Sequence, residues 1–216
     1  MSQSDSFIEE VTEEVRRDRL FALARRYGWI VVLALVLVIG GAAALEWRKA
    51  QARTVAQDLG DRVFTALEAD SAASRATRLS EIDASGAAAA VLRMLEAGEL
   101  ARTDAPRAGD LLKALAEDPD LPPLYRDLAT LKLVLLAEYP MFAEEKLDRL
   151  ATLTAPGAPF RLLAQEQMAL LAMETGDRDR ARDLVRPLID EAEADPAQRQ
   201  RAAQLFVVLG GNPEGL

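Results

Sequence analysis

The sequence predicts an all-α protein, in which a single N-terminal transmembrane helix precedes a solenoid of helical hairpins. Two observations lead to this prediction: an uncharged stretch over 28–45 and a regular spacing of helix breakers in the residues that follow. Alanine, leucine and arginine dominate these later residues, and all three favour helix. The alternating pattern of a half-buried strand is missing there. We therefore expect three parts, namely a tail over 1–27, a span over 28–45 and a helical domain over 46–216.

The uncharged stretch has the length of a membrane span. It reads GWIVVLALVLVIGGAAAL, eighteen residues of which ten are Leu, Ile or Val. As a helix it covers roughly 27 Å, close to the thickness of a bilayer's hydrocarbon core. Trp29 lies at its entry and Trp47, Arg48 and Lys49 follow it, as expected of aromatic and basic residues at membrane interfaces. A buried core helix is the alternative interpretation.

A cleaved signal peptide is a second alternative, and the residues before the span argue against it. A signal peptide starts with a short basic segment, whereas residues 1–26 form a long segment with six acids. We therefore expect an uncleaved anchor. Five arginines precede the span and four basic residues follow it closely, so the positive-inside rule favours a cytoplasmic N-terminus only slightly.

The tail is predicted to form an amphipathic helix over 7–26. Ser6 and Glu9 fit a capping box at its start, and glutamates precede arginines along it, as the helix dipole favours. An apolar stripe at helical spacing needs something to cover it. A solvated helix beside the membrane is the alternative. We interpret the stripe as a protein-binding surface made of Phe7, Ile8, Val11 and Val15.

Helix breakers divide the domain at steps of 33, 37 and 40 residues, counted from Gly86. Such a period is typical of arrays of helix-turn-helix repeats. The breakers are Ser85-Gly86, Asp118-Pro119, Ala155-Pro156-Gly157 and Asp195-Pro196. Between them we expect helix pairs over 46–69 and 73–83, 87–101 and 106–117, 123–138 and 141–152, and 159–174 and 178–193, with a last helix over 197–209.

The fourth pair is similar to a tetratricopeptide repeat. Ala169 and Ala172 supply small residues where two helices cross, and Gly176 lies at the turn. Its second helix carries Ala181, Val185 and Leu188 at positions i, i+4 and i+7. The closing proline comes late and the large aromatic residue near the start is missing, so the repeat is degenerate. A generic helical bundle is the alternative.

A stack of such pairs forms a concave surface from its first helices. In the fourth pair we expect five residues to point toward this groove and bind protein: Leu163, Glu166, Leu170, Met173 and Glu174. Met adapts to varied partners. The alternative is that Leu163 and Leu170 belong to the core. Arg126 and Arg161 are weaker candidates for binding a peptide carboxylate.

The composition argues against catalysis. The chain has neither histidine nor cysteine, the side chains that most often act as general base, nucleophile and metal ligand. It also has no glycine-rich phosphate loop. We therefore expect no catalytic residue, no cofactor, no metal site and no small-molecule substrate. Nucleic-acid binding is disfavoured because the whole chain has a net charge of −9.

The order of these features resembles the ancillary Sec-translocon subunit family. The resemblance lies in the N-terminal FIEEVTEEVRRDRL, the Tyr-Gly-Trp entry to one span, the following EWRKAQ and the tetratricopeptide-like pairs. It implies a bitopic protein of the bacterial inner membrane with a cytoplasmic N-terminus and a periplasmic domain. It also implies translocon subunits, periplasmic chaperones or emerging client chains as partners. The main alternative is a structural or assembly subunit of another envelope complex, serving cell division, cell-wall synthesis or respiration.

Overall fold

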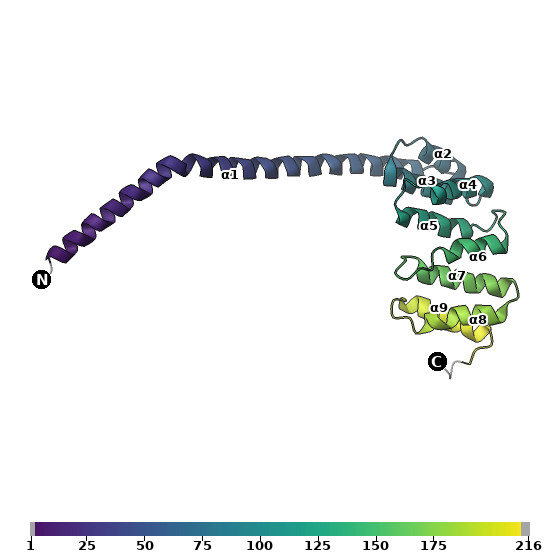
Figure 1. The fold of residues 1–216 in the computed structure, drawn as a ribbon. Helices are drawn as coiled ribbons and strands as arrows, with labels where there is room; N and C mark the ends of the chain where they lie inside the picture. The colour runs from purple at the N-terminus through teal and green to yellow at the C-terminus, as the bar shows by residue number, and fades with distance from the viewer. Residues whose placement is uncertain (1–2, 213–216) are drawn as a thin grey trace. The chain divides into compact units, whose positions relative to one another are not determined.

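The computed structural model describes the backbone of residues 3–212 and the side chains of Arg25, Trp29, Ile30 and residues 33–212. Within this part every regular element is a helix, which confirms the predicted all-α class. The chain divides into two compact units, 1–60 and 61–216, each described by itself below. The helices are α1 (Gln3–Leu67), α2 (Ala72–Ser80), α3 (Gly86–Leu100), α4 (Ala105–Glu117), α5 (Pro123–Val134), α6 (Ala143–Ala151), α7 (Arg161–Glu174), α8 (Arg178–Ile189) and α9 (Pro196–Val208) (Figure 1).

The first unit consists of α1 up to residue 60. The sequence predicts separate helices for the tail, the span and the first hairpin, whereas the structure joins them in one helix of 65 residues. Proline is the strongest helix breaker, and the first proline of the chain is Pro106. The glycines of the span, each unfavourable by about 1 kcal/mol in a helix, do not interrupt it.

Nearly all described side chains of this unit are exposed, including the large apolar ones; Leu37 is 66% and Val38 69% exposed. Among the residues described, no helix has an apolar stretch long enough to cross a membrane. The predicted span over 28–45 includes residues 28, 31 and 32, whose side chains lie outside the described ones. Also outside them are the side chains of the predicted tail surface, Phe7, Ile8, Val11 and Val15.

The second unit contains the end of α1 and the helices α2–α9, which follow one another in a stack (Figure 1). Each of these helices packs mainly against its neighbours in the sequence, and α3 also contacts α5. The pairing expected for α2 is corrected, because α2 packs against the helix that follows it, α3. This repeat-like arrangement is compatible with tetratricopeptide-like hairpins.

Helix boundaries follow local sequence signals. Asp104, Asp177 and Asp195 precede α4, α8 and α9, and each accepts a hydrogen bond from the backbone N–H three residues later. At the end of α7, Gly176 has a φ of 87°, a conformation that glycine adopts without strain. The N–H of Asp177 then donates to the carbonyl of Ala172 at 2.9 Å, which completes a Schellman motif. The predicted turn at Gly176 is confirmed.

Helix α5 ends at Val134, earlier than predicted, and the segment after it folds back onto α4. Pro140 disfavours helical backbone at the residue before it. The ring of that residue, Tyr139, lies against Gly109 of α4, where an added Cβ would lie within 3.0 Å of three ring atoms. The hydroxyl of Tyr139 donates to Oδ1 of Asp110 at 3.3 Å. Glycine at position 109 therefore leaves room for the segment that follows α5.

The core of the second unit comprises three clusters of buried side chains in series. The first joins α2 to α5, the next joins α5 to α7, and the last joins α7 to α9. Small residues lie where helices cross; Ala169 of α7 and Ala181 of α8 are both 0% exposed. Val185 and Leu188 are buried beside them. The predicted small and apolar faces of the fourth pair are therefore confirmed.

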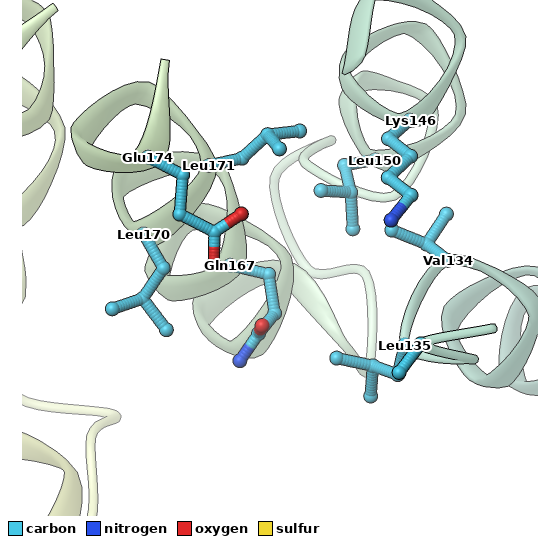
Figure 2. Close-up of a pocket in the computed structure, with 9 residues that line it drawn as sticks. Val134, Leu135, Lys146, Leu150, Gln167, Leu170, Leu171 and Glu174 are labelled. Atoms are coloured by element: carbon cyan, nitrogen blue, oxygen red, sulfur yellow. The ribbon is translucent and has the colours of Figure 1, made fainter. Parts of the chain in front are cut away.

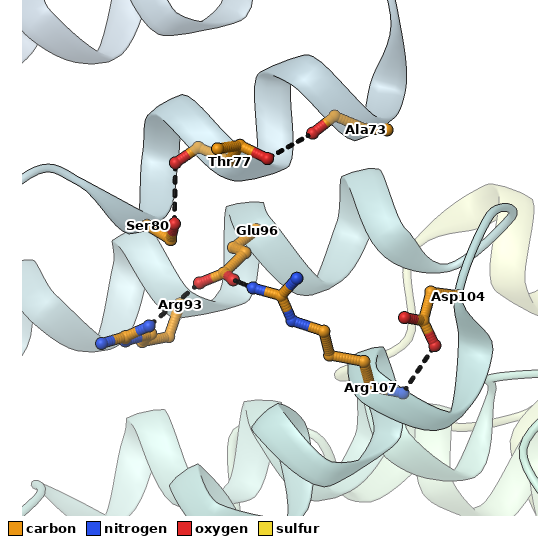
Figure 3. Close-up of polar contacts among 7 residues, drawn as sticks. All are labelled: Ala73, Thr77, Ser80, Arg93, Glu96, Asp104 and Arg107. Atoms are coloured by element: carbon orange, nitrogen blue, oxygen red, sulfur yellow. Dashed lines mark hydrogen bonds and ion pairs between the residues drawn. The ribbon is translucent and has the colours of Figure 1, made fainter.

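A buried carboxylate links α3 to α4. Glu96 is 1% exposed, and Arg107 of α4 and Arg93 of α3 approach its two oxygens at 2.8 and 3.1 Å (Figure 3). Asp104 caps α4 one turn before and holds the backbone N–H of Arg107 (Figure 3). Because a buried charge is tolerated when it is paired, this network is part of the packing. Among the described residues, no buried side-chain nitrogen or oxygen lacks a partner.

Candidate binding surface

The first helices of three consecutive pairs, α3, α5 and α7, contribute to two neighbouring cavities in the second unit. The larger has a volume of 340 Å³ and lies between α5, α6 and α7 (Figure 2). This size is at the lower end of the range for ligand pockets, about 300 to 1,000 Å³. Its walls combine apolar and polar side chains, among them Leu135, Lys146, Leu150, Gln167, Leu170 and Glu174.

Helix α7 forms one wall of this larger cavity with a single face. Gln167, Leu170, Leu171 and Glu174 follow the spacing i, i+3, i+4 and i+7, which places them side by side on a helix. Leu171 is buried, Gln167 and Leu170 are half-buried, and Glu174 is exposed. Figure 2 shows these four side chains together on α7. The wall therefore offers an apolar surface with an amide and a carboxylate, which accept or donate hydrogen bonds.

The opposite wall carries a positive charge. Lys146 of α6 lies above Val134 of α5, across the cavity from Glu174 (Figure 2). Lys146 is half-buried, and no other described residue forms an ion pair with it. Its ammonium group therefore keeps its hydrogen-bond donors available.

The smaller cavity, of 230 Å³, lies on the other side of the end of α5. Ala97, Gly98 and Ala101 of α3 line it, together with Lys132 and Leu135. Leu135 is the residue that directly follows α5; it is 48% exposed and lines both cavities. We call the residues that line the two cavities, on helices α3 to α7 and in the segment 135–137 after α5, the Leu135 surface.

Lysine is scarce in the second unit and concentrated on this surface. Residues 61–216 contain only Lys113, Lys132 and Lys146. Lys132 and Lys146 line the two cavities and are half-buried, whereas Lys113 is exposed on α4. Within the part of the chain that is described, Lys132 has no ion-pair partner either.

The structure brings together two of the five residues predicted for the groove. Leu170 and Glu174 both line the larger cavity. Leu163 packs against the core cluster between α5 and α7, as the alternative interpretation expects, and Met173 packs against the cluster between α7 and α9. Leu170 is half-buried and remains part of the surface.

The fifth residue, Glu166, lies in the interior. It is 6% exposed, and Nε and Nη2 of Arg201 on α9 approach its two carboxylate oxygens at 2.7 and 3.0 Å. The amide of Gln198 donates to the same carboxylate at 3.4 Å. The hydrogen bond to Glu166, followed by the attraction of its charge, raises the pKa of Arg201. Glu166 thus joins α7 to α9.

Arg161, a weaker candidate for a peptide carboxylate, already has partners of its own. Its guanidinium forms ion pairs with Glu193 at 2.8 Å and with Glu191 at 3.2 Å. The hydrogen bonds to Glu193 and Glu191 raise the pKa of Arg161. Arg126 of α5 is half-buried and lines neither of the two cavities.

Sequence reasoning did not identify Lys132, Leu135, Lys146 or Gln167. Two signals were present in the sequence. Lysine is rare beside arginine in this domain, and Gln167 precedes Leu170 and Glu174 at spacings of three and seven residues. Leu135 lines both cavities because it directly follows the end of α5. The segment after it folds onto α4, and the sequence does not reveal this contact between distant residues.

The polar groups of the Leu135 surface are suited to binding through charge and hydrogen bonds. In the described ranges, no group of three or more acidic side chains is placed to hold a metal ion. No family model, no curated protein and no solved structure matches the chain.

Proposed function

We propose that the chain is a non-enzymatic protein-binding module anchored in a bacterial inner membrane, where it serves as an ancillary subunit of the Sec translocon. In this proposal, residues 28–45 form the anchor and the Leu135 surface binds emerging client chains or periplasmic chaperones. The binding role depends on one observation, the two adjacent cavities that share a half-exposed leucine.

The chemistry of these cavities supports a protein ligand. Leu135 and Leu170 offer apolar contacts, while Gln167 offers a donor and an acceptor that match a peptide group. The cavities lie side by side along the stack, so one extended or helical segment can reach both. Docking of an extended or helical segment on a protein surface is a recurring mode of peptide recognition.

The exposed apolar side chains of α1 support an anchor. Between residues 29 and 45, the large side chains with high exposure are Trp29, Ile30, Leu33, Leu35, Val36, Leu37, Val38, Ile39 and Leu45. Covering each such side chain is worth about 1.5–3 kcal/mol, so a helix this apolar favours burial in lipid or against another protein. The eighteen uncharged residues of the sequence and the flanking Trp29 and Trp47 favour lipid.

An anchor would raise the occupancy of a weak binding surface. Holding a weak binding site beside the exit of a translocon raises the effective concentration of emerging chains, so the site is occupied more often. The resemblance of the N-terminal segments to ancillary translocon subunits supports this location, and the net negative charge argues against a nucleic-acid partner.

Site-specific photocrosslinking in cells tests the binding role. A photoreactive amino acid replaces Leu135 in the full-length chain, and a matched variant carries it at the exposed Lys113 on α4. We expect adducts with translocon-associated chains or chaperones from position 135 and few from position 113. Equal adduct patterns from both positions would contradict a role for the Leu135 surface.

Co-purification tests the anchored location. The full-length chain and a form that lacks residues 1–45 are expressed at equal levels and isolated from solubilised membranes. We expect translocon subunits with the full-length chain only. Equal recovery of these subunits with the truncated form would contradict the anchored-accessory proposal, while leaving peptide binding open to the crosslinking test.

A further inference from the structure

The two unpaired lysines give the Leu135 surface a chemical preference. We infer that this surface selects peptide segments in which apolar side chains lie next to carboxylates, with Lys132 and Lys146 binding the carboxylates. The inference rests on the proposed protein-binding role and goes beyond it, because it names the class of segment that binds.

Lys132 and Lys146 are complementary in charge to carboxylates. Lys132 and Lys146 are half-buried and have no ion-pair partner among the described residues. A partly desolvated ammonium group gains most from a carboxylate, because charge-assisted hydrogen bonds are roughly twice as strong as neutral ones. Arg107 and Arg201, in contrast, already form ion pairs with the buried carboxylates of Glu96 and Glu166. The lysines are therefore the available cations of this surface.

Each of the two lysines lies beside apolar side chains of the surface. Lys132 lines the smaller cavity together with Leu135 and Leu136, and Lys146 lines the larger one together with Leu135 and Leu170. Each cavity thus pairs one cation with leucine side chains. A segment that places apolar side chains on either side of Leu135 brings its neighbouring side chains within reach of the two lysines.

The α7 wall restricts which segments fit. Glu174 lies across the larger cavity from Lys146 (Figure 2). A carboxylate placed near Glu174 is repelled, whereas one placed near Lys146 is attracted. Gln167, on the same α7 wall as Glu174, matches a backbone amide group. The surface therefore favours acids toward α5 and α6 and neutral or basic residues toward α7.

The test compares two peptides on the full-length chain in mild detergent. The fluorescent probes are short peptides with the same leucine and phenylalanine residues, one carrying glutamates and the other glutamines in their place. At low salt we expect the acidic peptide to bind about tenfold more tightly than the amide peptide. This preference should fall as salt rises, because the two sites are partly exposed.

Five lysine variants test whether Lys132 and Lys146 produce this preference. In K132Q and in K146Q, we expect the acidic peptide to lose about three- to tenfold in affinity while the amide peptide keeps its own. K113Q removes the same charge from an exposed site outside both cavities and should leave both affinities unchanged. K132R and K146R keep the charge and should retain most of the preference. Circular dichroism of each variant checks that the helices are intact.

The outcomes separate the inference from the proposed function. Equal affinity of the two peptides at low salt, or a preference that K132Q and K146Q leave unchanged, overturns the inference while the binding role stands. Failure of both peptides to bind wild-type protein overturns the inference and removes the support for the Leu135 surface as a peptide site. If a glutamine variant unfolds, the inference is tested by how strongly salt weakens binding of the acidic peptide to wild type, and by the affinity of K132R and K146R for that peptide.

Discussion

Replacing Gly109 by alanine changes the free energy of unfolding through two opposing effects, helix propensity and packing. In an exposed helix interior this change stabilises, because alanine is favoured over glycine by about 1 kcal/mol. Gly109 is buried in α4, however, and an added Cβ would lie within 3.0 Å of three ring atoms of Tyr139. Those atoms belong to a rigid ring whose hydroxyl is held by Asp110 at 3.3 Å. The ring must therefore move for the methyl group to fit.

The magnitude follows from opposing contributions. Overpacking of a well-packed site costs about 1–3 kcal/mol. Displacing the ring also removes an exposed hydrogen bond, worth about 0.5–1.5 kcal/mol. The gain in helix propensity offsets about 1 kcal/mol of this. We expect Gly109→Ala to lower the free energy of unfolding by about 0.5–3.5 kcal/mol.

Urea denaturation of the full-length chain, followed by circular dichroism at 222 nm, measures the effect. The matched control is Gly98→Ala in α3, where nothing lies within 4 Å of the added Cβ. We expect that control to be neutral or to stabilise by up to about 1 kcal/mol. A shift of the two variants in opposite directions identifies packing, because propensity changes equally in both.

The double variant with Tyr139→Ala completes the cycle. Once the ring is removed, Gly109→Ala should stabilise, with a coupling free energy of about 1.5–4.5 kcal/mol between the two sites. If Gly109→Ala stabilises the wild-type protein as much as Gly98→Ala does, the reasoning about this contact is refuted.

Two further predictions concern ionisable groups. Glu166→Gln leaves Arg201 without its carboxylate partner and should lower the free energy of unfolding by about 1–3 kcal/mol. The control Glu174→Gln, at an exposed site on the same helix, should change this free energy little. Urea denaturation of both variants measures the difference. Burial raises the pKa of Tyr139 above its ordinary value of 10.0, so the folded state holds this proton more tightly than the unfolded state. Stability should therefore decline as pH rises through about 10 and above, and less so in Tyr139→Phe; thermal melts between pH 8 and 11 would show equal declines if this assignment is wrong.

Much of the fold was predictable because its signals are local. Asp177 and Gly176 mark a helix start and a turn through bonds to residues three to five positions away, and the structure contains both. The alanine faces of α7 and α8 follow from helical spacing alone. Breakers and periodicity therefore predicted most helix boundaries closely.

The composition of the surface was less predictable because it depends on distant partners. The sequence places Glu166 on the same helical stripe as Leu170, but its partner Arg201 lies 35 residues later and draws it into the interior. Leu135 appears in the sequence as one more helical leucine. Its exposure follows from the early end of α5, after which Tyr139 packs against Gly109 of α4.

The neighbour-by-neighbour packing of α2–α9 has a consequence for how the chain acquires its structure. Proteins rich in contacts between nearby residues fold quickly, because little loop entropy is lost before contacts form. Each core cluster spans three or four consecutive helices, so a chain that emerges N-terminus first can bury one cluster before the later helices appear. Only the helices of the cluster that is still forming then expose apolar surface, which limits the time available for aggregation or proteolysis.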